Sequence, residues 1–333
     1  MKTVNQTTRP PRRPKAVILT SATTARPYNT HSLEEMADIV WADAETLAAA
    51  LPGAEVLFVW DFFSTALRDA WEHADSLRWV HVAAAGVDTL LFDGLRESEV
   101  VITNARGAFD QPIAEFVLAS ILAHDKLLHE SKDLQREHVW RHREVRRTAG
   151  RRALVVGTGG IGRATGRLLA AVGLKVLGAG RTARDDDPDF GRIVATGDLL
   201  EHAGWADHLV LIAPLTDQTR GMLNAEVLAA MSPSAHLVNV GRGPLVDEPA
   251  LIGALRSGQI AAASLDVFSE EPLPAGHPFW EMPNVHISAH MSGDVVGWRD
   301  TLADQFEANL RAWTSGGGLS NIVDKDLGYA RRA

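Results

Sequence analysis

Short β-type runs alternate with helical patterns along almost the whole chain, and this alternation limits the folds it can adopt. Four such runs in the first third lie at residues 16–20, 55–60, 79–82 and 100–103. A helical pattern at 44–51 separates two of them. Because consecutive parallel strands need a crossover, usually a helix, the pattern predicts an α/β fold with parallel sheets covered on both faces. Residues 32–41 stay ambiguous, since Ser32 and Glu35 have capping-box spacing while Ile39 to Trp41 favour a strand.

A second alternating series fills the later half. Its six runs lie at residues 153–156, 175–178, 208–212, 236–240, 261–265 and 285–288. Six strands in this order suit a complete dinucleotide-binding sheet. Before them, residues 111–140 form one helical pattern that Pro112 opens and that is apolar nearly all round at 113–122, as expected for a helix buried between elements or subunits. An amphipathic helix is expected at 295–313, ahead of a glycine turn at 316–318.

Length and composition set the class of protein. The 333 residues predict two domains. Lys and Arg total 33 against 42 Asp and Glu, so the net charge of −9 disfavours nucleic acid and anionic membranes as partners. The chain has no cysteine, which excludes disulfides and thiolate chemistry and fits a cytoplasmic protein. No apolar run reaches the roughly 20 residues that span a membrane, and residues 1–14 are expected to be a disordered tail.

A glycine motif follows the first strand of the second series. It reads Gly157-Thr-Gly159-Gly160-Ile161-Gly162, directly after a strand and at the start of a helix that runs to about residue 171. Glycines here allow a tight turn, a close approach of the backbone to a pyrophosphate, and tight packing of helix on strand. The motif alone is weak, but strand, turn, helix and next strand are all present. We therefore expect a dinucleotide at this turn.

The residues after the next strand bear on which dinucleotide is bound. An NAD enzyme usually has an acidic residue there for the ribose 2′-hydroxyl, whereas this chain has Arg181, Thr182 and Arg184. Arginine suits a 2′-phosphate through charge-assisted hydrogen bonds. We expect NADP(H) to be preferred and NAD(H) to be possible. The alternative is that both arginines are solvated loop charges beside the aspartates at 185–187.

Three later segments resemble the D-isomer-specific 2-hydroxyacid dehydrogenase family, in particular its glyoxylate/hydroxypyruvate reductases. They are Asn239-Val-Gly-Arg-Gly-Pro-Leu-Val-Asp247, Leu265-Asp-Val-Phe-Ser-Glu-Glu-Pro272 and Pro283-Asn-Val-His-Ile-Ser-Ala-His290. Supporting stretches lie at 84–88, 103–107, 112–115 and 214–216, all in the expected order. The combination is highly specific, although each piece alone is not.

The resemblance implies a set of residue roles. Arg242 matches the arginine that binds the substrate carboxylate, His290 the general acid–base residue, and Glu271 the carboxylate that pairs with it. Each role suits the chemistry, since a guanidinium fork fits a carboxylate and an imidazole titrates near neutrality. Asp266 matches the residue that holds the nicotinamide carboxamide, and Ala85 and Gly86 the loop whose N–H groups bind substrate. The further cofactor contacts implied are Pro214, Thr216, Val240 and Gly241.

Two departures from the family pattern and several alternatives accompany this interpretation. Ala84 replaces a frequent glycine, and Gly241 replaces a small residue such as alanine.

Glu270 is a weaker candidate than Glu271 for the carboxylate, and His286 is a weaker candidate than His290 for the acid–base residue. His138 and His142 lack a third metal ligand, so no metal is expected. Formate dehydrogenases have glutamine in place of Glu271. A phosphite-type dehydrogenase keeps the same three residues, and a non-catalytic, corepressor-like NAD(P) sensor is the second class of hypothesis.

The sequence therefore predicts a two-domain oxidoreductase that transfers hydride between NAD(P)H and C2 of a small 2-oxo or 2-hydroxy acid. The substrate domain is expected at residues 15–107 plus 295–333, and the Rossmann domain at 108–294. Substrate would lie in a cleft between two Rossmann-like domains. A homodimer through the apolar helix that starts at Ile113 is implied by the resemblance. The particular acid and the physiological direction stay open.

Overall fold

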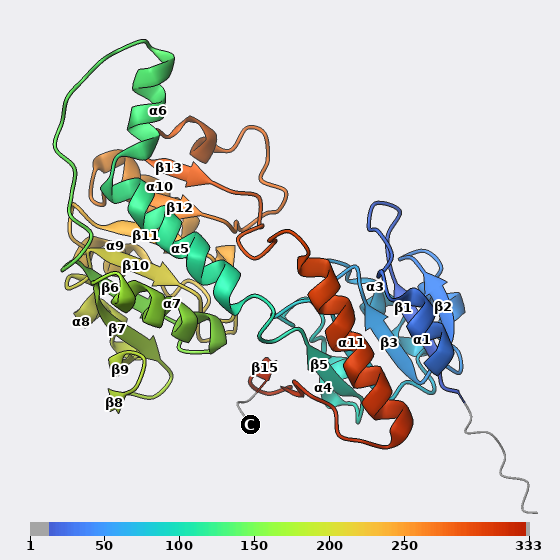
Figure 1. Cartoon of the computed structure of the whole chain (residues 1–333). Coiled ribbons are helices and arrows are strands. Elements are labelled where there is room, and N and C mark those ends of the chain that lie inside the picture. Colours follow the sequence, from blue (N-terminus) through green and yellow to red (C-terminus); the bar gives the residue numbers. More distant parts are fainter. Residues whose placement is uncertain (1–12, 331–333) are drawn as a thin grey trace, which may run out of the picture. The chain divides into compact units, whose positions relative to one another are not determined.

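The computed structural model describes residues 13–330, so most of the expected tail at 1–14 lies outside the described residues. The chain divides into two compact units. Unit 1 comprises the residues up to Ala108 together with those from Gly297 onward, and unit 2 comprises Phe109–Val296 (Figure 1). Each unit is built around its own sheet.

Unit 1 contains a five-stranded parallel sheet in the order β2-β1-β3-β4-β5. This order is that of the flavodoxin-like doubly wound fold. The strands are β1 (Lys15–Leu19), β2 (Asp38–Ala42), β3 (Val56–Val59), β4 (Trp79–Val82) and β5 (Val101–Asn104). The ambiguous segment at 32–41 proves to contain both predicted elements, because α1 (Thr30–Met36) ends just before β2 begins.

Helix α11 (Trp298–Ser315) covers one face of this sheet (Figure 1). The ring of Phe306 stacks on Phe58 with centroids 4.0 Å apart and lies 5.5 Å from the ring of Trp79. All three side chains are fully buried. Burial of such large rings is a main source of stability, so the C-terminal helix is part of the core of unit 1. The remaining elements of the unit are α2 (Leu47–Ala50), α3 (Ala66–Asp69), η1 (Trp71–His73), α4 (Asp93–Glu97), β14 (Val323–Asp324) and β15 (Tyr329–Ala330).

Unit 2 contains an eight-stranded sheet in the order β13-β12-β11-β10-β6-β7-β9-β8. Only the β8–β9 pair is antiparallel among these neighbours. The six predicted strands are present as β6 (Arg152–Val156), β7 (Lys175–Gly180), β10 (His208–Leu211), β11 (His236–Asn239), β12 (Ala262–Leu265) and β13 (Val285–Ile287). Two strands were not predicted, β8 (Arg184–Asp187) and β9 (Gly191–Ala195).

Helices flank the sheet of unit 2, and its central strands are buried on both faces, as their unbroken apolar sequences require (Figure 1). Within the sheet, β7 lies on one side of β6, and β10, which comes later in the chain, lies on its other side. The direction in which strands are added to the sheet therefore reverses at β6. Ligands bind at such a switch point, beyond the carboxyl ends of the strands. The helices and 3₁₀ turns are α7 (Gly160–Ala171), η2 (Thr196–Asp198), α8 (Leu199–Ala203), α9 (Ala225–Ala230), η3 (Gly243–Leu245), α10 (Glu248–Ser257) and η4 (Pro278–Glu281).

The single long helix expected at 111–140 is wrong, because the structure has two helices here. Helix α5 (Asp110–Asp125) and helix α6 (Leu128–Arg136) are separated by Leu127, whose φ of 52° is left-handed. The turn is fixed from outside, since the Lys126 ammonium donates to the carbonyl of Arg146 over 2.6 Å. The following segment, residues 137–148, has no helix or strand, so His138 and His142 do not share a helical face.

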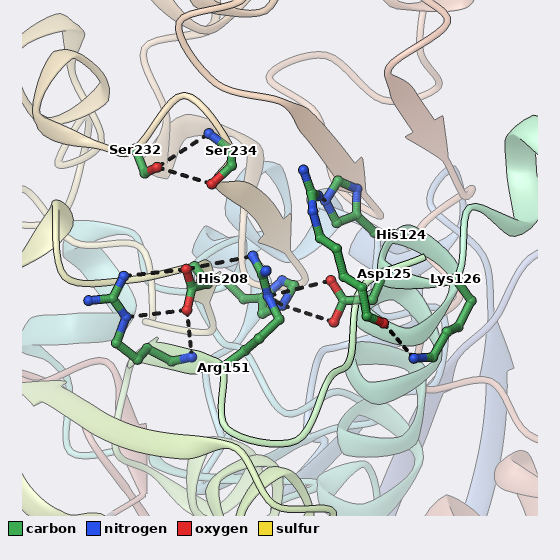
Figure 2. Close-up of polar contacts among 10 residues, drawn as sticks. His124, Asp125, Lys126, Arg151, His208, Ser232 and Ser234 are labelled. Atoms are coloured by element: carbon green, nitrogen blue, oxygen red, sulfur yellow. Dashed lines mark hydrogen bonds and ion pairs between the residues drawn. The ribbon is translucent and has the colours of Figure 1, made fainter. Parts of the chain in front are cut away.

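A buried polar cluster lies at the amino ends of β10 and β11. The rings of His124 and His236 stack with centroids 4.4 Å apart, and His208 meets both edge-on. Figure 2 shows the Asp125 carboxylate facing His208 and Arg151, with closest approaches of 3.4 Å and 3.6 Å. Buried polar groups of this kind require partners, so the cluster ties the end of α5 to the edge of the sheet.

Candidate active site

The sequence-predicted residues of unit 2 follow the carboxyl ends of consecutive parallel strands. Gly157 follows β6, Arg181 follows β7 and Pro214 follows β10; Arg242 follows β11, Asp266 follows β12 and His290 follows β13. Because carboxyl ends of parallel strands share one edge of a sheet, these residues collect at that edge. The sheet therefore supplies the common position that sequence spacing alone does not.

The glycine turn after β6 has the shape that a pyrophosphate needs. Gly157 has a φ of 112°, and a Cβ there would lie 2.7 Å from the backbone nitrogen of Ala213. A Cβ on Gly162 would lie 1.8 Å from the carbonyl oxygen of Gly157, so only glycine lets α7 start this close to β6. At Gly159 no atom lies within 4 Å of the added Cβ, so the outer side of the turn is open. The turn and the N-terminus of α7, with Gly160 and Ile161, therefore fit a dinucleotide phosphate.

The residues expected to determine cofactor preference lie at the end of β7. Arg181 and Thr182 are exposed immediately after the strand. Arg184 begins β8, and its Nε donates to Oδ2 of Asp187 over 2.9 Å. Arg184 therefore lies in a strand and not in a loop, and it forms an ion pair with Asp187.

The loop after β11 carries Arg242 and is tightly fixed. Asn239 accepts the N–H of Gly241 over 3.1 Å and donates to the carbonyl of Arg242 over 3.1 Å. A Cβ on Gly243 would lie 1.9 Å from the carbonyl carbon of Phe268. Only glycine lets this loop contact the 268–269 segment, and that contact brings Arg242 towards Glu271, three residues further along.

Glu271 and His290 form a direct pair. Nδ1 of His290 lies 2.6 Å from Oε2 of Glu271, and the other carboxylate oxygen accepts the N–H of Phe268 over 2.9 Å. Burial raises the pKa of Glu271, but the bonds from His290 and Phe268 and the charge of Arg242 outweigh burial and lower the pKa overall. The carboxylate is therefore ionised near neutral pH, and it holds the imidazole through Nδ1.

Asp266 braces the loop that carries His290. This fully buried carboxylate accepts the hydroxyl of Ser288 over 2.5 Å and the N–H groups of Met291 and Ser292 over 3.0 Å each. His290 itself has a φ of 50°, a left-handed conformation that is strained for a residue with a side chain. The three bonds to Asp266 hold the loop in this conformation. Both oxygens of Asp266 are thus engaged by the protein, whatever further contact it makes.

The turn after β10 contains Pro214 and Thr216, and Thr219 closes it. The Thr219 hydroxyl donates to the Pro214 carbonyl over 2.7 Å and accepts the N–H of Thr216 over 2.8 Å. Val240 and Gly241 lie beside this turn, since a Cβ on Gly241 would lie 3.1 Å from the carbonyl oxygen of Ala213. The structure therefore brings these four expected cofactor contacts together.

In unit 1, the expected substrate loop follows β4. The side chain of Asn104 donates to the carbonyl of Ala85 over 2.6 Å, and the N–H of Ala105 donates to the carbonyl of Ala84 over 2.9 Å. These two bonds hold the carbonyls of the loop against the end of β5.

Sequence reasoning missed several residues that support these loops. Ser288 acts through its hydrogen bond to Asp266, Thr219 through its bonds to Pro214 and Thr216, and Arg163 through an ion pair with Asp187. Ser288 lies two residues before His290, at the end of a predicted strand, and this position could have marked it as a supporting residue. Arg163 directly follows the glycine motif, but nothing in the sequence shows that its partner is 24 residues away.

The fold and this edge define a class of protein, the two-unit α/β proteins with a dinucleotide-binding sheet. Residues 118–292 match the family model described as "D-isomer specific 2-hydroxyacid dehydrogenase, NAD binding domain". The chain belongs to the D-isomer-specific 2-hydroxyacid dehydrogenase family, a family of NAD(P)-dependent oxidoreductases, and both the family resemblance and the predicted fold class are confirmed.

Curated relatives include a "Glyoxylate/hydroxypyruvate reductase A" from Serratia proteamaculans, 31% identical over 266 residues that cover 76% of this chain and 82% of the relative. A "Glyoxylate reductase" from Thermococcus onnurineus is 31% identical over 79% of this chain and 81% of its own length. A solved family member from Xanthobacter autotrophicus, in complex with NADPH and MES, is 33% identical with a TM-score of 0.80, covering 94% and 99% of the two chains. An NADPH-dependent glyoxylate/hydroxypyruvate reductase from Sinorhizobium meliloti, in complex with NADP and sulfate, is 28% identical with a TM-score of 0.82 over 96% and 100%.

Proposed function

We propose that this protein is an NADPH-dependent reductase of small 2-oxo acids of the glyoxylate and hydroxypyruvate type. The observation that carries the proposal is the Glu271–His290 pair at 2.6 Å, with Arg242 near enough for its charge to lower the pKa of Glu271. Reduction of a 2-oxo acid requires a cation that binds the substrate carboxylate, here Arg242, and an oriented acid–base group, here His290. Both lie at the sheet edge that carries the glycine turn.

The roles of the chain's own residues follow from these contacts. A nicotinamide cofactor, when bound, would supply the hydride for C2 of the substrate. Arg242 holds the carboxylate, and the same guanidinium stabilises charge that develops on the carbonyl oxygen. His290 delivers a proton to that oxygen from Nε2, because Glu271 engages Nδ1. Asp266 supports the nicotinamide end while it fixes the histidine loop.

The cofactor preference rests on the residues after β7. Arg181 occupies the position where an acidic residue would select NAD, and Arg184 lies three residues further on. Two guanidinium groups favour an additional phosphate. Two solved relatives carry NADPH or NADP, which supports the same choice for this chain. We place the reductase in the cytoplasm, where it would draw on the cellular NADPH pool.

The first experiment is oxidation of NADPH, and separately of NADH, followed at 340 nm with glyoxylate, hydroxypyruvate, phenylpyruvate and a branched 2-oxo acid. We expect turnover with NADPH and at least one acid, and His290→Ala should lower kcat/KM by about 10² to 10⁴. Turnover only with NADH would overturn the cofactor preference. Cofactor binding without turnover of any 2-oxo acid would favour the sensor hypothesis, and turnover of phosphite would favour a phosphite-type enzyme.

We also propose a homodimer through unit 2. Large apolar side chains are exposed on α6 and the 137–148 segment: Leu128, Val139, Trp140 and Val145, with Trp140 fully exposed. The segment is held in place, because Arg143 donates to the Leu127 carbonyl over 3.1 Å and to the Ser131 hydroxyl over 2.6 Å. A fixed, exposed apolar surface marks an interaction site, and a second copy of the chain is the partner we propose.

A further inference from the structure

The β8–β9 hairpin is clamped onto the helix that starts at the glycine turn. Arg163, in the first turns of α7, donates from Nη1 and Nη2 to the two carboxylate oxygens of Asp187 over 3.0 Å and 2.9 Å. Nη1 also contacts Asp189 over 2.5 Å. Arg163 and Asp187 are 9% and 5% exposed, so this bidentate pair is shielded from water.

Asp187 serves a second arginine as well. Its Oδ2 accepts Nε of Arg184 over 2.9 Å, and among residues 13–330 Asp187 is the polar partner of this guanidinium. A guanidinium has five N–H donors, so the four on Nη1 and Nη2 remain for a ligand. The Arg184 side chain is 48% exposed. Asp187 therefore fixes the inner edge of the guanidinium while its outer donors face solvent.

The β8–β9 hairpin lies beside the glycine turn. Arg184 pairs with Ile193 across the hairpin, and Ile193 pairs with Gly178 of β7. A Cβ on Gly180 would lie 2.7 Å from the hydroxyl of Thr158, which is inside the glycine motif. The hairpin thus packs directly beside the turn, and Arg184 stands three residues beyond Arg181.

The charges explain why a carboxylate can stand beside a phosphate site. Asp187 and Asp189 pair with Arg163, Arg167 and Arg184, so this ion-pair network joins three guanidinium groups to two carboxylates. The hydrogen bond from Arg163 holds the pKa of Asp187 far below its usual range. Because the buried Arg163 balances this carboxylate, the charge of Arg184 is not cancelled.

We propose that Asp187, braced by Arg163, is a positioning residue that aims the guanidinium of Arg184 at the 2′-phosphate of NADP. This inference rests on the proposed function and adds to it a specificity device outside the residues that face the cofactor. Asp187 acts through Arg184, so it should influence the 2′-phosphate and nothing else on the cofactor.

Calorimetric titration with NADP⁺ and with NAD⁺ tests this proposal without turnover. We expect Asp187→Asn to weaken NADP⁺ binding by about tenfold, the size of one charged hydrogen bond. Binding of NAD⁺ should change by less than about twofold. The matched control is Asp185→Asn in the same hairpin, because within the described part of the chain Asp185 pairs only with the exposed Arg192, at 3.5 Å. This control should bind both cofactors as the wild type does.

A second variant covers the case in which Asp187→Asn fails to fold. Arg184→Lys keeps the positive charge on an exposed side chain. A lysine ammonium, however, cannot donate to Asp187 as Nε does and at the same time present two further N–H donor groups to a phosphate. We expect it to lose NADP⁺ affinity nearly as fully as Arg184→Ala, and Asp187→Asn should add nothing in an Arg184→Ala background. Wild-type NADP⁺ affinity in Arg184→Lys, or equal losses of NADP⁺ and NAD⁺ affinity in Asp187→Asn, would overturn the inference about Asp187. Neither result would overturn the proposed function. Failure of the wild type to bind either cofactor would overturn the proposed function too.

Discussion

The backbone N–H of His290 donates to the backbone carbonyl of Asp266 over 2.8 Å, so the loop that carries His290 is attached to the end of β12. The side chain of Asp266 then accepts three further donors from the same loop. A single residue thus holds His290 in its left-handed conformation. The position of the imidazole depends on a buried carboxylate that need not touch the substrate.

Asp266→Ala removes the acceptor from three donors at once. We expect kcat/KM to fall at least tenfold and the free energy of unfolding to fall by about 3 kcal/mol, because buried donors left unpaired cost about 1–3 kcal/mol each. Steady-state kinetics and urea denaturation check the two effects. Ser288→Ala, which removes a single donor, should cost much less. Equal effects of the two substitutions would contradict the bracing role.

Glu271→Gln keeps the shape of the side chain but removes its charge. We expect kcat/KM for 2-oxo acid reduction to fall by about 10- to 100-fold, because a neutral amide stabilises the imidazolium less well. The Kd for NADP⁺ should be unchanged in calorimetry, since Glu271 contacts His290 and Phe268. Glu270→Gln, at the preceding position, is the control. A comparable loss in Glu270→Gln would mean that the wrong glutamate has been assigned.

The buried histidine cluster predicts loss of stability in mild acid. Burial lowers the pKa of His124 from 6.5 to about 4, helped by His208 and Arg146, and lowers the pKa of His236 well below 6.5. Between pH 6.5 and 4 the unfolded chain binds protons that the folded chain refuses, so stability present above pH 6.5 is lost as the pH falls through this window. Below pH 4, His124 is protonated in both states and adds no further loss.

Thermal denaturation at pH 7.5 and pH 5 measures this effect. We expect Tm to fall between the two, with each such histidine contributing up to about 1.4 kcal/mol per pH unit. His124→Gln can still accept from Arg146 but does not titrate, so its Tm should depend less on pH. His31→Gln, at an exposed site, is the control. A pH dependence of Tm unchanged in His124→Gln would contradict the assignment.

The proposed dimer makes Trp140 a large contributor to an interface. A tryptophan buried on association contributes 2 kcal/mol or more at many interfaces, so Trp140→Ala should raise the dimer Kd by about 30-fold or more. Light scattering after size exclusion at several concentrations detects the shift. Trp280→Ala, at another exposed tryptophan, serves as the comparison. A wild-type chain that stays monomeric at high concentration would refute the proposed dimer.

Most strands of the two sheets were predictable because they are short apolar runs between turn residues. The β8–β9 hairpin was not, since Arg184 to Asp187 contains four charged residues, and the Arg163 partner of Asp187 comes from α7. The break at Leu127 was also invisible, because no glycine or proline marks it and a contact with Arg146 fixes it. Both the hairpin and the break are local structures that depend on side chains far away in the sequence.

The candidate site divides in the same way. Residues in motifs, such as Arg242 and His290, could be selected from the sequence, and the structure places Glu271 beside His290. Supporting residues could not be selected, since the link from Asp266 to Ser292 spans 26 positions and the link from Arg163 to Asp187 spans 24. Such links exist only once the strands are ordered in a sheet.

The order of the chain imposes an order of synthesis on the two units. Unit 2 is one continuous segment, whereas unit 1 lacks α11 until the residues after Gly297 leave the ribosome. Until then the face of its sheet that carries Phe58 and Trp79 has no Phe306 to cover it. Since domains fold as units during translation, unit 2 is complete while unit 1 still exposes an aromatic surface. The nascent chain therefore passes through a stage at which chaperone binding to its N-terminal segment would matter most.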